Sequence, residues 1–314
     1  MSGRLMVTGG AGFIGSHVVE TALQAGWDVA VLDDLSSGSE SNVPPAARLY
    51  KVDVRDAAGV LKAMTEFRPT VISHQAAQAS VSVSVRDPML DASVNIIGGL
   101  NVLNAARDCG VERVVFASTG GAIYGEVPDG EQATETSVPR PYSPYATSKL
   151  AFETYLQTYQ QQYGLAYSIL RYANVYGPRQ NPHGEAGVVA IFATRLVQGQ
   201  EITINARQET GDDGCIRDYV FVTDVARANL MAAQGKTPAV LNIGTGVPVT
   251  TRVLAEQLAE ALRVTPQLRF APPRAGDLER SVIDPTSYEA AIGRLTTLES
   301  GLAQTAEWAT TAGS

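Results

Sequence analysis

A tyrosine and a lysine stand one helical turn apart in the stretch SPYATSK, residues 143–149. Residues four apart share a helix face, so Tyr145 and Lys149 are expected to point into the same crevice. An ammonium group beside a phenol favours the phenolate and lowers the pKa of the phenol. Such a pair supplies a base that works near neutral pH. Pro141 and Pro144 restrict the backbone just before the pair and constrain the approach of the helix.

A Y-x-x-x-K pattern alone more often reflects a half-buried tyrosine beside a snorkelling lysine, so the surrounding elements decide its meaning. The stretch VTGGAGFIGS, residues 7–16, places Gly9, Gly12 and Gly15 between an expected strand and an expected helix. This spacing gives a tight turn, a close approach of backbone to a pyrophosphate, and phosphate oxygens at a helix N-terminus. A tight turn without any ligand is the alternative.

Acidic residues at the ends of the next expected strands sharpen this prediction. Asp33 follows the glycine turn by about 20 residues, where a carboxylate can bond the adenosine ribose of a dinucleotide. A carboxylate there also repels a 2′-phosphate, which favours NAD over NADP; Asp34 is the neighbouring alternative. Asp53 and Val54 end the third expected strand, where an adenine edge would lie, although both suit an ordinary strand end equally well.

Short β-branched runs alternate with amphipathic helical stretches in the first half of the chain. The alternation predicts an α/β fold, a Rossmann-type doubly wound parallel sheet with helices on both faces. One expected helix has Ile14, Val18 and Leu23 broadly on one face and stops at Gly26; another begins near Asp56. Its apolar residues are Val60, Leu61, Met64 and Phe67. The expected strands, with both faces buried, are residues 4–9, 28–33, 48–54, 69–76, 112–118 and 166–172.

The sequence changes in character after the sixth expected strand. Residues 174–187 are rich in Pro, Gly and Asn and are expected to form a long surface loop. We expect a dinucleotide-binding domain over residues 1–177 and a smaller C-terminal α/β domain over 178–314. Residues around 217–243 are expected to return to the first domain.

The composition is that of a soluble globular protein, with 314 residues, 45% hydrophobic and 18% charged. A formal net charge of -8 argues against non-specific binding to nucleic acid or anionic lipid. No apolar run reaches the ~18 residues of a membrane span. The two cysteines, Cys109 and Cys215, lie far apart, and with three histidines they show no metal-ligand spacing. We therefore expect a cytoplasmic protein without a disulfide framework or a metal.

Three motifs occur together in the chain: TGGAGFIG, STGGAIYG and YATSK. In this combination the chain resembles the extended short-chain dehydrogenase/reductase superfamily, and within it UDP-glucose 4-epimerases. The resemblance covers nearly the whole chain. It includes, in order, the segments HQAAQASV, NVYGPRQ, RDYVFVTDVA, NIGTG and PPRAGDLERS.

The resemblance implies an NAD-dependent isomerase that inverts C4 of UDP-hexoses. Tyr145 would remove the proton from the sugar 4-hydroxyl while C4 passes a hydride to tightly bound NAD. The 4-keto sugar would then turn over and recover the hydride on its other face, while Lys149 also bonds the nicotinamide ribose. Further cofactor contacts are implied for Phe13, Ile14, Ala76, Asn95, Ser118 and Tyr172.

One position departs from the family pattern. Gly120 stands where many relatives carry a catalytic Ser or Thr, counting back from Tyr124. Ser118 and Thr119 lie just before it; we favour Thr119 as the hydroxyl partner of Tyr145, and a water could also fill the gap. The sister 4,6-dehydratases carry an Asp-Glu pair in this segment, and its absence disfavours dehydration.

The same resemblance predicts how the nucleotide is held. Asn174 matches a contact to the substrate diphosphate, and Arg217 and Arg274 match two arginines that clamp it. Asp277 would bind the uridine ribose. Ser281 would line the sugar pocket, where a small residue leaves room for an N-acetyl group, so UDP-GlcNAc and UDP-GalNAc are further hypothetical substrates. Without the family context, a surface ion pair of Arg217 with Asp213 or Asp218 would be the simpler interpretation.

Two other functions stay open at this point. Another sugar-nucleotide enzyme, such as a UDP-glucuronate 4-epimerase, could share every cofactor residue. A non-catalytic NAD-sensing module is the second, although such modules usually lack the Tyr and Lys pair. Residues 150–164 resemble a dimer-forming helix and predict a homodimer, with packing inside one chain as the alternative. His74 and His183 are assigned structural roles.

Overall fold

A computed structural model gives the structure of residues 3–182, 187–274 and 276–312. The chain forms two compact units, which are described one at a time. The first comprises Met1–Thr119, Pro141–Arg171 and Val225–Leu241, and the second comprises Gly120–Arg140, Tyr172–Asp224 and Asn242–Ser314. The units are interleaved rather than divided by one cut at residue 177. Only residues 225–241 of the expected returning segment group with the first unit, whereas 120–140 group with the second.

A seven-stranded sheet with the order β11-β6-β5-β4-β1-β2-β3 organises the first unit. The pairs β3–β2, β2–β1, β1–β4 and β4–β5 are parallel. This is the strand order of a doubly wound nucleotide-binding fold, so the predicted fold class is confirmed. The strands are β1 (Arg4–Thr8), β2 (Asp28–Asp33), β3 (Arg48–Lys51), β4 (Val71–His74), β5 (Arg113–Thr119), β6 (Ala166–Tyr172) and β11 (Val240–Ile243).

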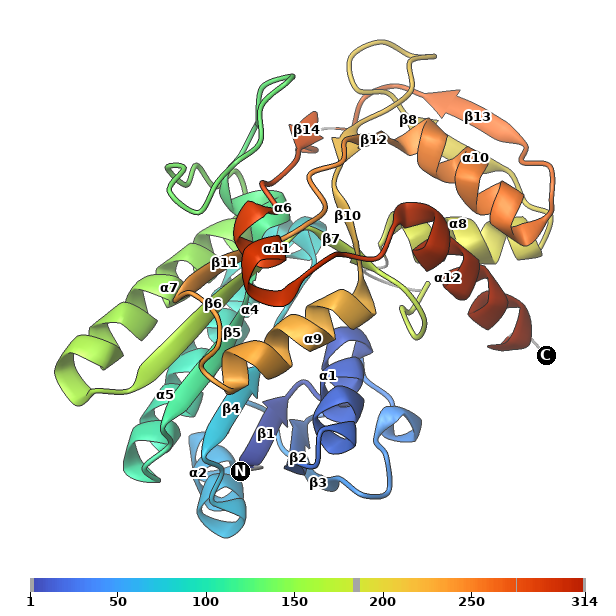
Figure 1. Ribbon diagram of the computed structural model, residues 1–314. Helices are drawn as coiled ribbons and strands as arrows, with labels where there is room; N and C mark the ends of the chain where they lie inside the picture. Colours follow the sequence, from blue (N-terminus) through green and yellow to red (C-terminus); the bar gives the residue numbers. More distant parts are fainter. Residues whose placement is uncertain (1–2, 183–186, 275, 313–314) are drawn as a thin grey trace. The chain divides into compact units, whose positions relative to one another are not determined.

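Helices cover both faces of this sheet (Figure 1). On one face, α2 (Ala57–Phe67), α5 (Gly99–Asp108) and α7 (Pro144–Tyr163) share a core with alternate strand residues such as Met6 and Ile72. On the other face lie α1 (Phe13–Gln24) and α9 (Val222–Ala233). The Ser73 hydroxyl of β4 donates to Asn229 of α9 at 3.0 Å. Three short helical segments fill residues 81–98: α3 (Val81–Arg86), α4 (Pro88–Ala92) and the π-helical η2 (Ser93–Gly98).

Some expected details are wrong because of where the elements lie. The third strand was expected to be buried on both faces, but β3 is an edge strand with exposed ends and a half-buried centre. Of the four apolar residues of the second expected helix, Val60, Met64 and Phe67 are buried, whereas Leu61 is 40% exposed. In α1 the buried face is made by Gly15, Val18, Val19 and Ala22, while Ile14 and Leu23 are half-buried.

The start of α7 follows from its sequence. The Ser143 hydroxyl accepts a hydrogen bond from the Ala146 amide at 3.2 Å and caps the helix. Pro144 occupies the first helical turn, where no intrahelical partner for its nitrogen is needed. Gly164 ends the helix in the left-handed region, with φ of 74°. The 20-residue helix therefore begins at a fixed point, one residue before Tyr145.

The second unit has three small sheets, ordered β10-β7, β12-β9-β14 and β13-β8. Its core lies around α8, α10 and α12 and includes Phe192, Leu254 and Leu302. The expected loop 174–187 contains a strand, β7, whose Tyr176 is 1% exposed. The strands are β7 (Asn174–Tyr176), β8 (Ile202–Asn205), β9 (Ile216–Arg217), β10 (Tyr219–Phe221), β12 (Val249–Thr250), β13 (Leu268–Ala271) and β14 (Arg280–Ser281). The helices are α6 (Gly120–Ile123), α8 (Val188–Val197), α10 (Thr251–Leu262), α11 (Thr286–Ile292) and α12 (Leu298–Ala312).

A buried carboxylate holds the second unit together between β9 and β10. Asp218 is 1% exposed and accepts from the Thr245 amide at 2.8 Å, the Thr245 hydroxyl at 2.7 Å and the Gly246 amide at 3.0 Å. Burial raises the pKa of Asp218, while these donors act in the opposite direction. The hydrogen bonds of this carboxylate thus connect the loop after β11 to the chain between β9 and β10.

We predict that Asp218→Ala lowers the free energy of unfolding by several kcal/mol, because each buried donor left unpaired costs ~1–3 kcal/mol. Asp213→Ala is the matched control, since Asp213 is exposed and its ion-pair contact with Arg252 is 3.5 Å long. Urea unfolding of both variants, followed by circular dichroism, measures the difference. Equal midpoints for the two variants would contradict the structural role of Asp218.

Candidate active site

The three glycines of the turn differ in what an added Cβ atom would contact. Gly9 has φ of +69°, and a Cβ there would lie 2.6 Å from the amide nitrogen of Ala76. A Cβ on Gly15 would collide with the Gly9 carbonyl oxygen. A Cβ on Gly12 would meet only that same oxygen, at 3.3 Å. The chain itself therefore requires Gly9 and Gly15, whereas Gly12 leaves open the approach to the helix that follows.

The N-terminus of α1 suits an anionic group. No side chain caps it at Gly12, and no acidic residue lies in its first turn. The first N–H groups of a helix have no intrahelical partner. The positive end of the helix dipole lies at the same terminus. Phe13 and Ile14 contribute such groups, so the residues present fit a dinucleotide pyrophosphate.

Asp33 lies directly beside the glycine turn. Its carboxylate accepts from the Ala11 amide at 2.9 Å and from the Leu35 amide at 2.8 Å. Burial raises the pKa of Asp33 against the effect of these two amides. Asp34 is exposed and accepts instead from the amide and hydroxyl of Ser36. Of the two acids, the geometry therefore favours Asp33 as the ribose ligand.

The two residues predicted near an adenine edge differ in their surroundings. Asp53 forms an ion pair with Arg55, and the Arg55 guanidinium lowers the pKa of Asp53. Val54 is 5% exposed and packs in the core of the first unit. Their contact with a cofactor stays a prediction, because the local bonds of both residues are explained within the chain.

Lys149 is buried beneath Tyr145. It is 3% exposed, its Nζ donates to the carbonyl oxygen of Ala117 at 3.0 Å, and it lies 5.9 Å from the centroid of the Tyr145 ring. Burial lowers the pKa of Lys149 to about 8, against the opposing effect of Asp91. Most Lys149 side chains are therefore protonated at pH 7. The two residues share one face of α7, as their spacing predicted.

His74 lies next to the lysine in the interior. Its Nδ1 is 2.7 Å from the Thr8 hydroxyl, and its ring stacks on Phe116. Burial, with a contribution from the Lys149 charge, lowers the pKa of His74 to about 3. The ring is thus neutral at physiological pH, and these contacts account for it structurally. His183 lies outside the residues that the structure describes.

The two candidate hydroxyls at the end of β5 differ in their bonding. The Ser118 hydroxyl donates to Glu153 at 2.5 Å, and Glu153 forms a buried ion pair with Arg171 at 2.6 Å. The Ser118 proton is therefore already committed inside the protein. Thr119, 7% exposed, carries no such bond to Glu153, which favours it as the hydroxyl partner of Tyr145. Sequence reasoning did not single out Glu153 and Arg171, because the partner of Glu153 on β6 is known only from the folded chain.

Asn95 takes part in a buried amide network. Its side-chain oxygen accepts from the Gln78 amide at 2.9 Å. Its nitrogen lies 2.9 Å from the Gln78 carbonyl, 3.0 Å from Asp91 and 3.2 Å from the Ser148 hydroxyl. The side chain implied to contact the cofactor is thus engaged by the chain itself, and its contact with NAD stays a prediction. Gln78, Asp91 and Ser148 were not singled out from the sequence.

The residues predicted to hold the nucleotide gather in the second unit. Arg274 and Asp277 form a two-bond pair, with distances of 3.0 and 2.8 Å. Arg217 donates to the carbonyls of Leu278 at 2.6 Å and Ile216 at 2.9 Å. The proposed ion pair of Arg217 with a neighbouring aspartate is therefore not needed to explain its position.

Strand pairing and a hydrogen bond bring two more predicted residues, Ser281 and Asn174, near Arg217. Ser281 of β14 stands opposite Arg217 of β9 in register, is 2% exposed, and donates to the Gly121 carbonyl at 2.9 Å. The side-chain nitrogen of Asn174 donates to the Asp218 carbonyl at 3.1 Å. Tyr172, the last residue of β6, is 5% exposed, and its cofactor contact stays a prediction.

Cys215 also lies in this region, next to β9, and nothing in the sequence indicated that it is near the predicted arginines. Burial raises the pKa of its thiol, Arg217 lowers it, and Asp277 raises it. Arg274 is also within electrostatic range of the thiol. Within the described residues, no group of three or more His, Cys, Asp or Glu side chains could hold a metal ion. No helix in that part of the chain is both long and apolar enough for a membrane span.

The model of the NAD dependent epimerase/dehydratase family matches residues 5–244. The chain belongs to this family. It is 44% identical to the UDP-glucose 4-epimerase of Mycolicibacterium smegmatis, over 97% of this chain and 98% of that protein. The crystal structure of Thermus thermophilus UDP-glucose 4-epimerase with NAD has a TM-score of 0.95 and 56% identity, and the match covers 98% and 99% of the chains. The Thermotoga maritima UDP-glucose 4-epimerase with UDP-glucose has a TM-score of 0.92 and 44% identity, covering 99% and 100%. The resemblance found from the motifs is confirmed.

We predict that Gly12→Ala and Gly15→Ala separate ligand binding from folding. Gly12→Ala should keep the melting temperature of the cofactor-free protein and weaken NAD binding at least tenfold, because its methyl group blocks the open approach. Gly15→Ala should lower the melting temperature, because its methyl group meets the Gly9 carbonyl. Calorimetric titration with NAD and thermal unfolding measure the two effects. Unchanged NAD affinity in Gly12→Ala would contradict a pyrophosphate at this turn.

Proposed function

We propose that the protein is a UDP-glucose 4-epimerase, which interconverts UDP-glucose and UDP-galactose with bound NAD. The observation that carries the proposal is Lys149, an ammonium group buried under the ring of Tyr145 on one face of α7. Relatives and solved structures with the name UDP-glucose 4-epimerase match this chain over nearly its whole length. The fold supports the cofactor, because the glycine turn and Asp33 stand at the carboxyl ends of β1 and β2.

The first unit offers the residues that would hold NAD. The N-terminus of α1 would bind the pyrophosphate, and Asp33 would bind the adenosine ribose while it disfavours a 2′-phosphate. When bound, NAD supplies the acceptor for the hydrogen on C4 of the sugar. The remaining proposed contacts are Gly9, Gly12, Gly15, Asp53, Val54, Ala76, Asn95 and Ser118, together with Tyr172, which the division of the chain assigns to the second unit.

Tyr145 is proposed as the acid and base for the sugar 4-hydroxyl. The charge of buried Lys149 stabilises the phenolate, so Tyr145 can take the proton near neutral pH and return it later. Burial strengthens this effect, because a charge acts more strongly where water is excluded. Thr119 is proposed to hydrogen-bond the sugar oxygen and steady it during the transfer.

The second unit offers the residues that would hold the nucleotide. Arg217 and Arg274 are proposed to bind the diphosphate, with Asp277 on the uridine ribose and Asn174 as a further diphosphate contact. Ser281 is small and keeps its hydroxyl on a main-chain carbonyl. We propose that space beside it admits an N-acetyl group, so that the acetylated pair UDP-GlcNAc and UDP-GalNAc is also turned over.

We predict that UDP-galactose is converted to UDP-glucose without added NAD and without net NADH, because the hydride returns to the sugar. Chromatography of the products and absorbance at the NADH wavelength measure both outcomes. A panel with UDP-glucuronate and UDP-GlcNAc separates a glucuronate 4-epimerase from the proposed enzyme.

We predict that Tyr145→Phe lowers turnover at least 1,000-fold with the fold retained, because phenylalanine has no hydroxyl to take the proton.

Tyr142→Phe is the matched control, since Tyr142 is 70% exposed and lies two residues before the first residue of α7. Near-normal turnover by Tyr145→Phe would overturn the base assignment. NAD binding with no turnover of any UDP-sugar by the unmodified protein would favour a sensing module instead.

We also propose a cytoplasmic homodimer formed through α7 and the segments packed beside it. Helix α4 and segment η2 pack on α7. Large apolar side chains on these three elements are exposed: Met89 77%, Ile97 54%, Tyr155 39% and Tyr163 54%. A second copy of the chain can cover such a surface on a twofold axis.

We predict that the double variant Met89→Asp/Ile97→Asp is monomeric, because charges in the centre of an apolar interface are costly to desolvate. Val138→Asp is the control, since Val138 is 73% exposed and lies in the second unit. Light scattering after gel filtration gives the mass of each protein. A double variant that stays dimeric would place the interface elsewhere.

A further inference from the structure

A buried carboxylate lies close to the proposed catalytic pair and is not explained by it. Asp91 of α4 is 1% exposed. Its Oδ1 accepts hydrogen bonds from the side-chain nitrogen of Gln78 at 2.9 Å and from that of Asn95 at 3.0 Å. Burial raises the pKa of Asp91, while its hydrogen bonds and the charge of Lys149 act in the opposite direction. Amide nitrogens only donate, so both amide partners match an ionised carboxylate, and such a buried charge needs a positive charge nearby.

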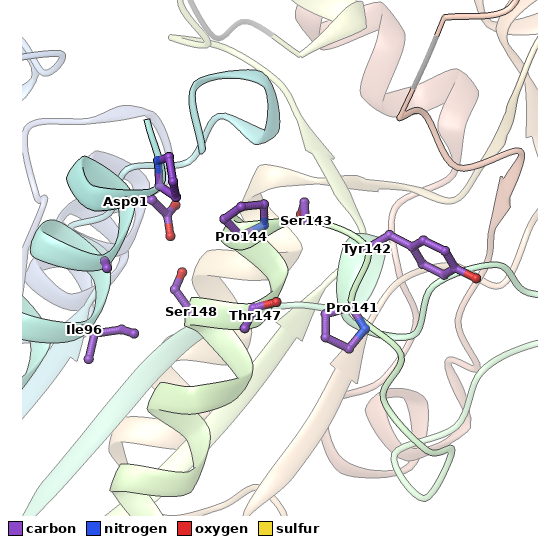
Figure 2. A pocket seen from close by; sticks show the side chains of 10 residues that line it. Asp91, Ile96, Pro141, Tyr142, Ser143, Pro144, Thr147 and Ser148 are labelled. Carbon is purple, nitrogen blue, oxygen red and sulfur yellow. The ribbon is translucent and has the colours of Figure 1, made fainter. Parts of the chain in front are cut away.

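The network of Asp91 reaches the turn of α7 that carries the pair. Asn95 also donates to the Ser148 hydroxyl at 3.2 Å, and that hydroxyl donates to the Tyr145 carbonyl at 2.9 Å. Asp91 and Ser148 both line a cavity of about 640 Å³, and Figure 2 shows their side chains pointing toward one another. Lys149 follows Ser148 in the chain, so the network is bonded to the turn of α7 on which both members of the pair stand.

Asp91 is the acid whose charge acts on Lys149. Burial lowers the pKa of Lys149, and the charge of Asp91 raises it. The other ionisable groups around the lysine do not replace this effect. His74 on β4 is neutral, Tyr145 is the group that Lys149 serves, and Glu153, one turn further along α7, is paired with Arg171.

We propose that Asp91 is a positioning residue that, through Asn95 and Ser148, fixes the turn of α7 that carries Tyr145 and Lys149. This inference rests on the proposed function, in which the charge of Lys149 makes Tyr145 a base. Asp91 need not touch substrate or cofactor; it acts through Lys149 and Ser148. Loss of its charge should make Lys149 release its proton at lower pH.

The first test is the pH dependence of kcat for Asp91→Asn, measured with saturating UDP-galactose between about pH 6 and 9.5. The alkaline limb should move to lower pH by roughly one unit, because a removed neighbouring charge shifts a buried group by about that much. KM should change less than twofold. Asp87→Asn is the matched control, because Asp87 caps the same helix through the Leu90 amide and asparagine caps equally well. Its profile should superimpose on that of the unmodified protein.

The second test needs no turnover and uses the cofactor-free protein. The folded-state pKa of Lys149, about 8, lies below its unfolded value, so its charge opposes folding below pH 8. That cost disappears as the pH rises from about 8 to about 10.5. The stability of the unmodified protein relative to Lys149→Met should therefore rise over this window. In the Asp91→Asn background the same rise should begin roughly one pH unit lower.

The proposal would be overturned if Asp91→Asn changed neither the alkaline limb of the kcat profile nor the pH at which stability rises. Asp91 would then carry no charge that acts on Lys149. Asp91→Ser is a second variant, because it removes the charge beside a cavity that water can enter. Failure of both variants to fold would assign Asp91 a purely structural role and also overturn the proposal. If the unmodified protein turned over no UDP-sugar, only the proposed function would be refuted. The pH dependence of stability would still test the effect of Asp91 on Lys149, because that measurement needs no turnover.

Discussion

The arrangement of the first unit depends on one buried ammonium group, that of Lys149. Lys149 donates a hydrogen bond to a main-chain carbonyl at the end of β5 and lies against the rings of Phe116 and Tyr145. Burial of an isolated ammonium is unfavourable and lowers its pKa, so the charge persists only while its partners are held in place. The strand end, the helix start and the buried polar network are the parts that hold them.

Helix α7 brings three ionisable residues to one face at intervals of four. Tyr145 lies in the first turn, Lys149 in the second, and Glu153 in the third. Glu153 meets Arg171 of β6 and the Ser118 hydroxyl of β5 in the interior. A buried ion pair adds little net stability but fixes one arrangement, because a broken pair leaves a charge without a partner. The pair therefore sets the rotation of α7 against β5 and β6, and with it the position of Lys149.

Much of the first unit could be predicted because its signals are local. Strand and helix alternation, the glycine turn and the cap at Ser143 each follow from residues within one or two turns of chain. Gln78 and Asp91, by contrast, meet Asn95 and Ser148 only after three short helical segments fold onto α7. No periodicity marks these segments, and η2 is a π-helix, which has no strong sequence pattern. The second unit was harder for the same reason, since its two- and three-residue strands are defined by long-range pairing.

The charges of the second unit suggest how an acidic protein can bind an acidic ligand. Arg274 is 69% exposed and bound by Asp277, whereas Arg217 is half-buried and bound to main-chain carbonyls. An exposed ion pair contributes only ~0–1 kcal/mol, so Arg274 and Asp277 can separate at little cost when better partners arrive. A diphosphate offers Arg274 two or more charged oxygens, and a ribose offers Asp277 hydroxyl donors. In the proposed function, the pair would keep both side chains ordered and leave each available to one half of the same nucleotide. In the proposed function, Arg217, already fixed by Leu278, would supply the stationary side of the clamp.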